Sequence, residues 1–349
     1  MKTKLKMQRS IYKNLTLVLA CLFLFSLMIS GCRSCDDEVI APVLTPPEDH
    51  PTGRILVSID TGNTWQVQNV ALGEKFFSVI RTYDNSGDLF MVAGTKGTFI
   101  GSRDGIDWNR FSHFTDTTIL KILSPGNNSG MIAGINEEKD FLLSTNYGSN
   151  WSMTRVQEGS EMISIDIDPT NNNNLLICKE LGEIFKSTNR GQNWVRKNFL
   201  IEPAYMSDIR YLSGYTALVT ASVLGIYRST DSGESWVIAN TPVSFGFNSI
   251  GYNPEWQFVF VTTNTNESIL RSPNNGIDWV EIKTSVGGIG NVNKIAISYA
   301  GVCIGAGNSG CILKSTDYGI TWRRIESGTG FDLYDVIFVN NSFLIAVGD

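Results

Sequence analysis

The chain repeats one short motif seven times, and the spacing of the copies restricts the folds open to it. The last copy reads KSTDYGITW at residues 314–322. Consecutive copies are separated by 42 or 43 residues. A period of this length indicates a repeat architecture, in which each unit packs against its neighbours. The tryptophans that end the copies are Trp65, Trp108, Trp151, Trp194, Trp236, Trp279 and Trp322.

Each repeat contains four short strand patterns. In the last repeat they cover residues 293–298, 302–307, 311–315 and 321–326, and the motif joins the third to the fourth. Four short antiparallel strands in about 40–45 residues are typical of a β-propeller blade. The sequence therefore predicts an all-β fold, a seven-bladed β-propeller of four-stranded antiparallel blades.

The two ends of the repeat array predict how the ring closes. Residues 53–58 have the pattern of a third strand, and residues 343–349 have that of a second strand. The last blade is therefore expected to combine strands from both termini, which would hide the sheet edges that an open array exposes. Residues 52–349 form one predicted propeller domain, with no segment left for a second folded domain.

The first 31 residues predict export. Five basic side chains precede the apolar run at residues 15–29, which is shorter than the roughly 20 residues that cross a bilayer as a helix. This is the pattern of a signal peptide, with an uncleaved membrane anchor as the alternative. ISGC at residues 29–32 resembles the bacterial lipoprotein box. That resemblance implies cleavage before Cys32 and lipid attachment to it.

Residues 32–51 are acidic and rich in proline, which predicts an extended tether. An acidic run at residues 36–38 resembles the export signal of surface-exposed lipoproteins in Bacteroidota. We therefore expect a lipid-anchored protein of the bacterial cell envelope, on the outer membrane and with its propeller displayed at the cell surface.

Charge and composition exclude several classes of partner. Without residues 1–31 the chain has 23 basic and 34 acidic side chains, a net charge of −11. This disfavours nucleic acid and anionic lipid headgroups, which both need a basic surface. The expected contact with the membrane is therefore the lipid on Cys32. No cysteine pair has metal-ligand spacing and the chain has two histidines, so no metal site and no cofactor are predicted.

The repeated motif, with its consensus Ser-x-Asp-x-Gly-x-Thr-Trp, resembles the Asp box or bacterial neuraminidase repeat. An Asp in a tight turn accepts hydrogen bonds from nearby backbone N–H groups, and the Gly adopts a positive φ. The Trp is expected to be buried, with one partner for its N–H group. The acidic or amide position is Asp60, Asp104, Asn146, Asn189, Asp231, Asn274 and Asp317 in the seven copies.

These positions are predicted to be structural. Three copies carry Asn, which keeps an acceptor oxygen and loses the charge that a catalytic carboxylate needs. One or two acidic groups per copy are also too few for calcium, which takes six to eight oxygens. The resemblance to other Asp-box propellers places the motif turns on the face opposite the usual binding site. No catalytic residue is predicted among them.

The candidate ligand surface is therefore expected on the other face, in the loops from second to third strands and from fourth strands to the next blade. The loop at residues 135–140 offers Glu137, Glu138 and Asp140, and the loop at residues 196–206 offers Phe199 and Tyr205. The simpler alternatives are a solvated acidic turn and aromatic side chains that fold back on the blade.

Seven regular Asp-box blades with an exported N-terminus resemble the photosystem II stability and assembly factor type of propeller. That resemblance implies a non-catalytic, lipid-anchored scaffold that binds a protein or peptide at its loop face, and we expect a monomer. The alternative is a cell-surface glycan-binding protein or a sialidase-like glycoside hydrolase that uses Glu137 or Glu138. Sialidases need three substrate-binding arginines, and only Arg81 and Arg210 lie on predicted first strands. A pair of carboxylates about 5 to 10 Å apart, as glycosidases use, is still compatible with the sequence.

Overall fold

The structure is a computed structural model that describes part of the chain. The described residues are 53–70, 73–111, 113–157, 159–197, 205–222, 224–243, 246–264, 268–284 and 292–349. The predicted signal peptide, Cys32, the predicted tether and Phe199 lie outside them. Within the described residues, no helix has the length and apolar character needed to cross a membrane.

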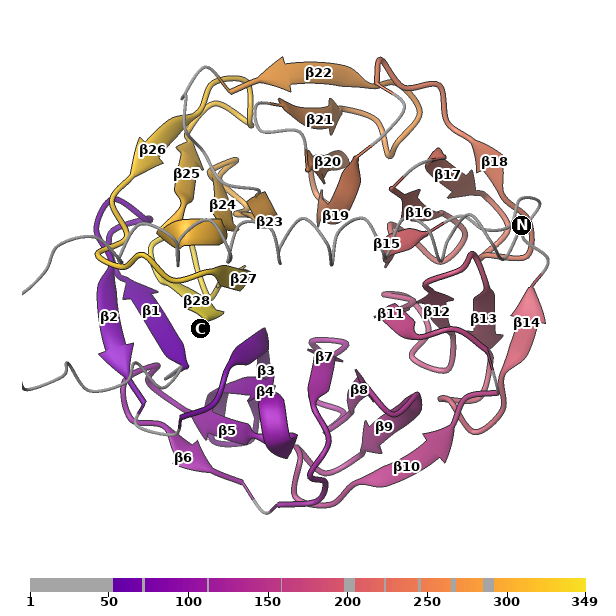
Figure 1. Ribbon diagram of the computed structural model, residues 1–349, viewed down its shortest axis with the longest axis horizontal. Helices are drawn as coiled ribbons and strands as arrows, with labels where there is room; N and C mark the ends of the chain where they lie inside the picture. Colours follow the sequence, from indigo (N-terminus) through magenta and orange to yellow (C-terminus); the bar gives the residue numbers. More distant parts are fainter. Residues whose placement is uncertain are drawn as a thin grey trace, which may run out of the picture. The chain divides into compact units, whose positions relative to one another are not determined.

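The described residues form seven four-stranded antiparallel sheets arranged in a ring (Figure 1). We number the blades by their first strands in chain order, so blade 1 begins with β3 and blade 7 with β27. The first, innermost strands are β3 (Phe76–Asp84), β7 (Ile119–Leu123), β11 (Met162–Ile167), β15 (Met206–Tyr211), β19 (Phe247–Asn253), β23 (Val292–Ile297) and β27 (Leu333–Phe338). The second strands are β4 (Gly87–Gly94), β8 (Ile132–Asn136), β12 (Leu175–Lys179), β16 (Ala217–Ala221), β20 (Phe258–Thr263), β24 (Cys303–Gly307) and β28 (Leu344–Gly348).

The outer half of each blade carries the motif. The third strands are β5 (Phe99–Ser102), β9 (Asp140–Ser144), β13 (Ile184–Ser187), β17 (Gly225–Ser229), β21 (Ser268–Ser272), β25 (Ile312–Ser315) and β1 (Arg54–Ser58). The fourth strands are β6 (Asn109–Arg110), β10 (Ser152–Arg155), β14 (Val195–Lys197), β18 (Val237–Ile238), β22 (Val280–Lys283), β26 (Arg323–Ile325) and β2 (Gln66–Asn69). The only helices among the described residues are two short 3-10 turns, η1 (Thr95–Gly97) and η2 (Asn308–Gly310).

Blade 7 closes the ring with strands from both ends of the described chain. Its strand order is β2-β1-β28-β27, and Ile55 of β1 pairs with Val347 of β28. The prediction of a seven-bladed propeller with a last blade built from both termini is confirmed.

The hydrophobic core lies between neighbouring blades. Second strands are almost wholly buried, as the pattern of β12 shows. Motif tryptophans pack against the preceding blade: the ring of Trp194 in blade 3 lies 5.3 Å from that of Phe141 in blade 2. Because each sheet is covered on one side by the preceding blade and on the other by the following blade, its inner strands are runs of apolar residues.

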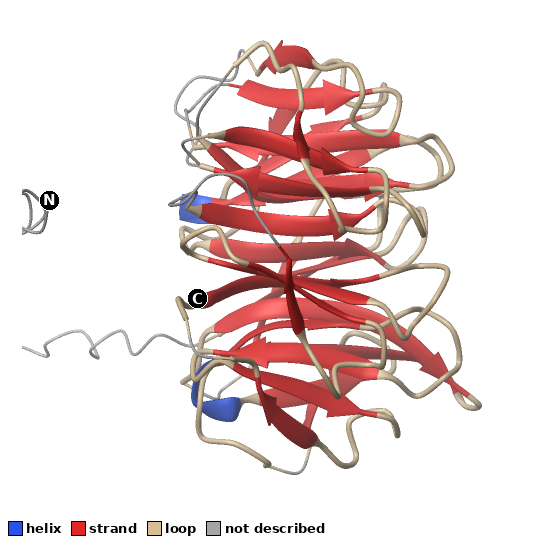
Figure 2. Ribbon diagram, turned by 90° about the vertical axis from the view of Figure 1, so that its right-hand side faces the viewer, coloured by secondary structure: helices blue, strands red, loops and turns tan. Residues whose placement is uncertain are grey.

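The strands cross the thickness of the ring, so their connections lie on two faces (Figure 2). We call the face with the first-to-second and third-to-fourth turns the Asp-box face, because the motif forms the latter. The other face, with the second-to-third turns and the fourth-to-first connections, is the loop face. The gaps in the described residues between 53 and 349 fall in connections of this second kind.

Every first strand has a register shift near its start. In β11 it lies between Met162 and Ser164, and in β15 between Met206 and Asp208. A β-bulge of this kind adds one residue to one strand and redirects the side chains that follow. The bulges therefore determine which side chains turn toward the centre of the ring.

Candidate functional site

The motif turns are built by their own hydrogen bonds. In all seven copies the Ser hydroxyl donates to Oδ1 of the Asp or Asn, over 2.7–3.1 Å. The same hydroxyl accepts the N–H of the motif Gly. Oδ1 then accepts the N–H of the residue before the Trp, over 2.8–2.9 Å.

This geometry explains the exchange of Asp for Asn. Oδ1, which both residues have, accepts the Ser hydroxyl and the N–H of the residue before the Trp in all seven copies. The second oxygen of Asp60 takes only the Thr64 hydroxyl, over 2.7 Å. Burial acts to raise the pKa of Asp60, but the hydrogen bonds from Thr64, Ser58 and Asn63 together outweigh it and lower the pKa to about 2. A carboxyl group held ionised in this way cannot serve as a general acid near neutral pH.

Two constraints require glycine at this position of the motif: a positive φ and a close approach to the preceding blade. Gly191 has a φ of +79°, and a Cβ atom there would lie 2.0 Å from Cε1 of Phe141 in the preceding blade. Six copies also hold the residue before the Gly at positive φ, as Arg190 shows at 56°. The copy in blade 1 lacks that residue, because Gly105 follows Asp104 directly.

The motif tryptophans meet the prediction of one N–H partner only in part. Four of them donate to the carbonyl of the motif Gly, over 3.0–3.2 Å. The indole N–H groups of Trp65, Trp194 and Trp236 have no acceptor among the described residues. Packing of the ring therefore fixes these side chains without that bond.

The structure does not bring the loop-face candidates together. Glu137 and Glu138 are exposed in the second-to-third turn of blade 2, where Glu137 Oε1 accepts the N–H of Thr118 over 2.7 Å. Asp140 pairs with Arg155 over 3.1 Å. Tyr205 precedes β15 in blade 4, and its carbonyl accepts the N–H of Ser222. The acidic residues and Tyr205 therefore lie on different blades.

Polar side chains that the sequence analysis did not single out meet around the centre of the ring. Each follows the bulge of its first strand, except in β19, where the belt residue lies within the shifted stretch. We call the set the channel belt. Its members, from blade 1 to blade 7, are Ser78, Lys121, Ser164, Asp208, Ser249, Lys294 and Asp335.

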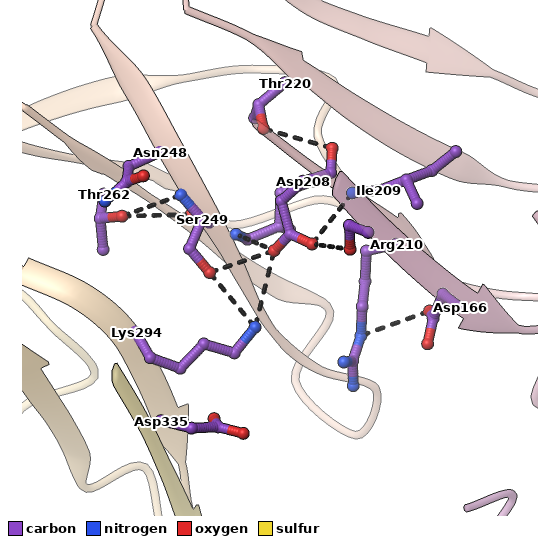
Figure 3. Close-up of polar contacts among 12 residues, drawn as sticks. Asp166, Asp208, Ile209, Arg210, Thr220, Asn248, Ser249, Thr262, Lys294 and Asp335 are labelled. Carbon is purple, nitrogen blue, oxygen red and sulfur yellow. Dashed lines mark hydrogen bonds and ion pairs between the residues drawn. The ribbon is translucent and has the colours of Figure 1, made fainter. Parts of the chain in front are cut away.

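Asp208 is the hub of the channel belt. It is 4% exposed and lies between two lysines, with Lys121 Nζ 3.2 Å from Oδ1. On the other side, Lys294 Nζ lies 3.5 Å from Oδ2 (Figure 3). Burial acts to raise its pKa, but the two ammonium groups and the hydrogen bonds hold the pKa well below its usual range. Four further donors reach it: Ser164 Oγ at 2.6 Å, Ser249 Oγ at 3.1 Å, and the N–H groups of Ile209 and Ile250 at 3.0 and 2.9 Å.

Asp335 joins blade 7 to blade 1, and its pKa is shifted in the direction opposite to that of Asp208. Its Oδ2 accepts the N–H of Val79 over 3.0 Å and the hydroxyl of Ser78 over 3.3 Å. Burial raises its pKa, and the attraction of Lys294 offsets this only in part. Burial also lowers the pKa of Lys294, despite the attraction of Asp208. The two carboxyl groups of the belt are thus shifted in opposite directions.

A cavity of about 500 Å³ extends from the channel belt to the first-to-second turns. Lys121, Lys294 and Asp335 line its inner end, and Tyr299 and Asn340 line its outer end. It therefore opens on the Asp-box face, opposite the face that the sequence analysis favoured. Arg210 lines the wall, and its Nε lies 3.6 Å from Oδ2 of Asp166 (Figure 3).

The chemistry available in the channel is limited. The Asp208 carboxylate has six donors around it, which leaves no lone pair directed at a substrate. Its low pKa also makes it a weak base. Among the described residues, no group of three or more His, Cys, Asp or Glu side chains could hold a metal ion. The arrangement suits non-covalent binding at the cavity mouth better than bond cleavage.

Comparisons with known proteins agree with the fold. The profile of the family of photosynthesis system II assembly factor YCF48 matches residues 57–349. Among curated protein sequences, none matches the chain significantly.

Solved structures resemble the chain at low identity. YCF48 from Cyanidioschyzon merolae has a TM-score of 0.61 at 16% identity, over 78% of this chain and 95% of that one. A structure of YCF48 bound to D1 peptide gives 0.61 at 15% identity, over 85% and 97%. A streptogramin B lyase gives 0.66 at 10% identity, over 85% and 98%. At these identities the likeness shows the fold alone.

Proposed function

The chain belongs to the family of photosynthesis system II assembly factor YCF48, and on that premise we propose that it is a non-catalytic protein that binds a peptide segment of a partner. The carrying observation is the channel belt, whose central carboxylate is ionised, buried and fully hydrogen-bonded. The relative with a bound D1 peptide supports peptide binding by this fold.

We place the binding site at the cavity mouth on the Asp-box face. The cavity gives this face a preformed concave surface with polar groups at its base, as ligand sites commonly have. The loop face is the competing location, because it carries Glu137, Glu138 and Tyr205.

Selection from a peptide library tests the proposal. The protein, purified from its own membranes in mild detergent, is immobilised and exposed to displayed random peptides of about twelve residues, long enough to cross several blades. We expect enrichment of linear peptides whose binding weakens when Asn340 is changed to Arg, which would block the cavity mouth. Binding that is insensitive to Asn340→Arg and lost in a Tyr205→Ala variant would move the site to the loop face.

A glycan panel separates this function from the sugar-directed alternative. Sialosides, plant glucans and host glycans are incubated with the protein, and released products are followed by mass spectrometry. We expect no turnover. Product release that disappears in Glu137→Gln or Glu138→Gln would replace the binding proposal with a glycoside hydrolase.

We also propose that a lipid on Cys32 anchors the protein in the bacterial envelope, at the outer membrane and facing the cell surface. The lipoprotein-box resemblance supports this. Intact mass measurement is expected to show a chain that begins at lipid-modified Cys32. The Cys32→Ser variant should leave the membrane fraction, and retention of that variant in the membrane would argue for an uncleaved anchor. Protease treatment of whole cells distinguishes surface display from an inward-facing location.

A further inference from the structure

One sector of the Asp-box face presents aromatic side chains to solvent. Trp256, in the first-to-second turn of blade 5, is 42% exposed, and Tyr299, in the same turn of blade 6, is 68% exposed. The indole N–H of Trp256 donates to the Tyr299 carbonyl over 2.9 Å. The Trp256 ring lies 5.5 Å from that of Tyr318. We call these three residues the aromatic shelf.

The aromatic shelf is held rigidly from below. Tyr318 lies 5.7 Å from the ring of Phe258, and the Arg271 guanidinium covers that ring at 4.2 Å. Arg271 Nε also donates to the Tyr318 carbonyl over 2.8 Å. The side chains of the shelf are therefore already fixed before a partner binds, which lowers the entropic cost of binding.

The corresponding turns of four other blades are rich in asparagine. The aromatic shelf thus faces carboxamides across the mouth of the cavity, and Tyr299 and Asn340 both line it. Tyr, Trp, Asn, Ser and Gly are also the residues that antibody paratopes use, because they combine rigid aromatic anchors with adaptable hydrogen bonds. The exposed asparagines are Asn85 in blade 1, Asn127 and Asn128 in blade 2, Asn171 and Asn173 in blade 3, and Asn340 and Asn341 in blade 7.

Charge indicates the chemistry of the partner. Glu255, next to Trp256, is exposed, and the motif aspartates lie on the same face. Two cations on this face are paired with carboxylates, Arg81 with Asp88 and Arg103 with Asp84. Arg271 lies beneath the shelf, where the Phe258 ring and the Tyr318 carbonyl engage it. Among the described residues, no ion pair links a basic side chain to Glu255. The field at the shelf therefore favours positive charge.

We propose that the aromatic shelf binds a basic, extended segment of the partner protein, a refinement that rests on the proposed function. An Arg or Lys side chain of that segment lies over the face of Trp256, beside Tyr299, where the ring quadrupole attracts it. Glu255 adds charge complementarity, and the asparagines hydrogen-bond the backbone of the segment.

The peptides from the library selection test this refinement directly. We expect them to be enriched in Arg and Lys and to change the fluorescence of the protein, because Trp256 is the most exposed of its tryptophans. Measured by fluorescence anisotropy, Trp256→Ala should weaken their binding by about tenfold, the effect of losing one desolvated cation–π contact. Glu255→Gln should weaken it by roughly threefold and reduce its salt dependence.

The control is Leu181→Ala, which removes a side chain that is 41% exposed in a second-to-third turn on the opposite face and should leave affinity unchanged. Acidic or uncharged peptides, or equal affinity in Trp256→Ala, would overturn the aromatic shelf as the site while leaving peptide binding in place. A sugar that alters Trp256 fluorescence when no basic peptide does would also overturn it. If no peptide is enriched at all, the proposed function itself fails.

Discussion

The Asp-box turns and the channel belt are both polar, but they stabilise the ring in different ways. Each Asp-box turn repeats nearly the same residues, and the hydrogen bonds common to all seven copies stay within the turn. The channel belt uses Ser, Lys and Asp in an irregular order around the ring, and its bonds cross from one blade to the next. A repeated motif thus builds the blades, while an unrepeated set of charges fixes the blades around the channel.

Removing the hub of the belt should cost the most stability. Asp208→Ala leaves Lys121 and Lys294 without their shared carboxylate in a largely buried setting. We expect a loss of about 3–5 kcal/mol in the free energy of unfolding, measured by denaturant titration. Asp335→Ala is the matched control and should cost less, because burial already disfavours its charge. Equal losses would show that the two positions are equivalent.

The motif glycines should come next. Gly191→Ala places a methyl group against Phe141 at a positive φ, whereas Gly126→Ala meets a similar φ of +70° with no atom within 4 Å. We expect Gly126→Ala to cost about 1–2 kcal/mol from the backbone alone. Gly191→Ala should cost roughly 1–3 kcal/mol more, because the core between blades 2 and 3 is overpacked. Thermal unfolding of the two variants measures the difference. Equal changes in the unfolding midpoint would mean that blades 2 and 3 move apart enough to accommodate the added methyl group.

The pH dependence of stability should distinguish the two belt carboxyl groups. The pKa of Asp208 is lowered in the folded state, so its contribution is present above the unfolded pKa of about 3.8 and is lost as pH falls below it. The pKa of Asp335 is raised, so its contribution is present below that value and is lost as pH rises through the folded pKa.

Two amide variants measure these opposite slopes. From about pH 3 to pH 7, the stability difference between the unmodified protein and Asp208→Asn should grow. The difference from Asp335→Asn should shrink over the same range. Denaturant midpoints at several pH values give both slopes, and slopes of the same sign would contradict the assignment of opposite shifts.

The sequence predicts the Asp-box turns, which repeat, but it does not predict the channel belt. Seven spaced tryptophans establish the propeller, and Asn146, Asn189 and Asn274 identify the turns as structural. The channel belt was missed because a bulge at or just before each belt residue breaks the simple alternation of the strand. A sequence signal exists: Lys121, Asp208, Lys294 and Asp335 lie 87, 86 and 41 residues apart, which are steps of two, two and one repeats, each in the first strand of its blade. Their mutual contacts could not be predicted without the bulge.

The smallest effect is expected inside a motif turn. Asp317→Asn keeps the Oδ1 acceptor for the N–H of Thr321, at 2.9 Å, and alters only the contact of Oδ2 with the Thr321 hydroxyl. We expect a change within about 0.5 kcal/mol, as for surface substitutions that spare a turn. Asp317→Ala removes the acceptor and should cost about 1 kcal/mol, like a lost helix cap. If Asp317→Asn proves as costly as Asp317→Ala in thermal unfolding, the charge stabilises this turn, and the three Asn copies must be held by packing against the preceding blade instead.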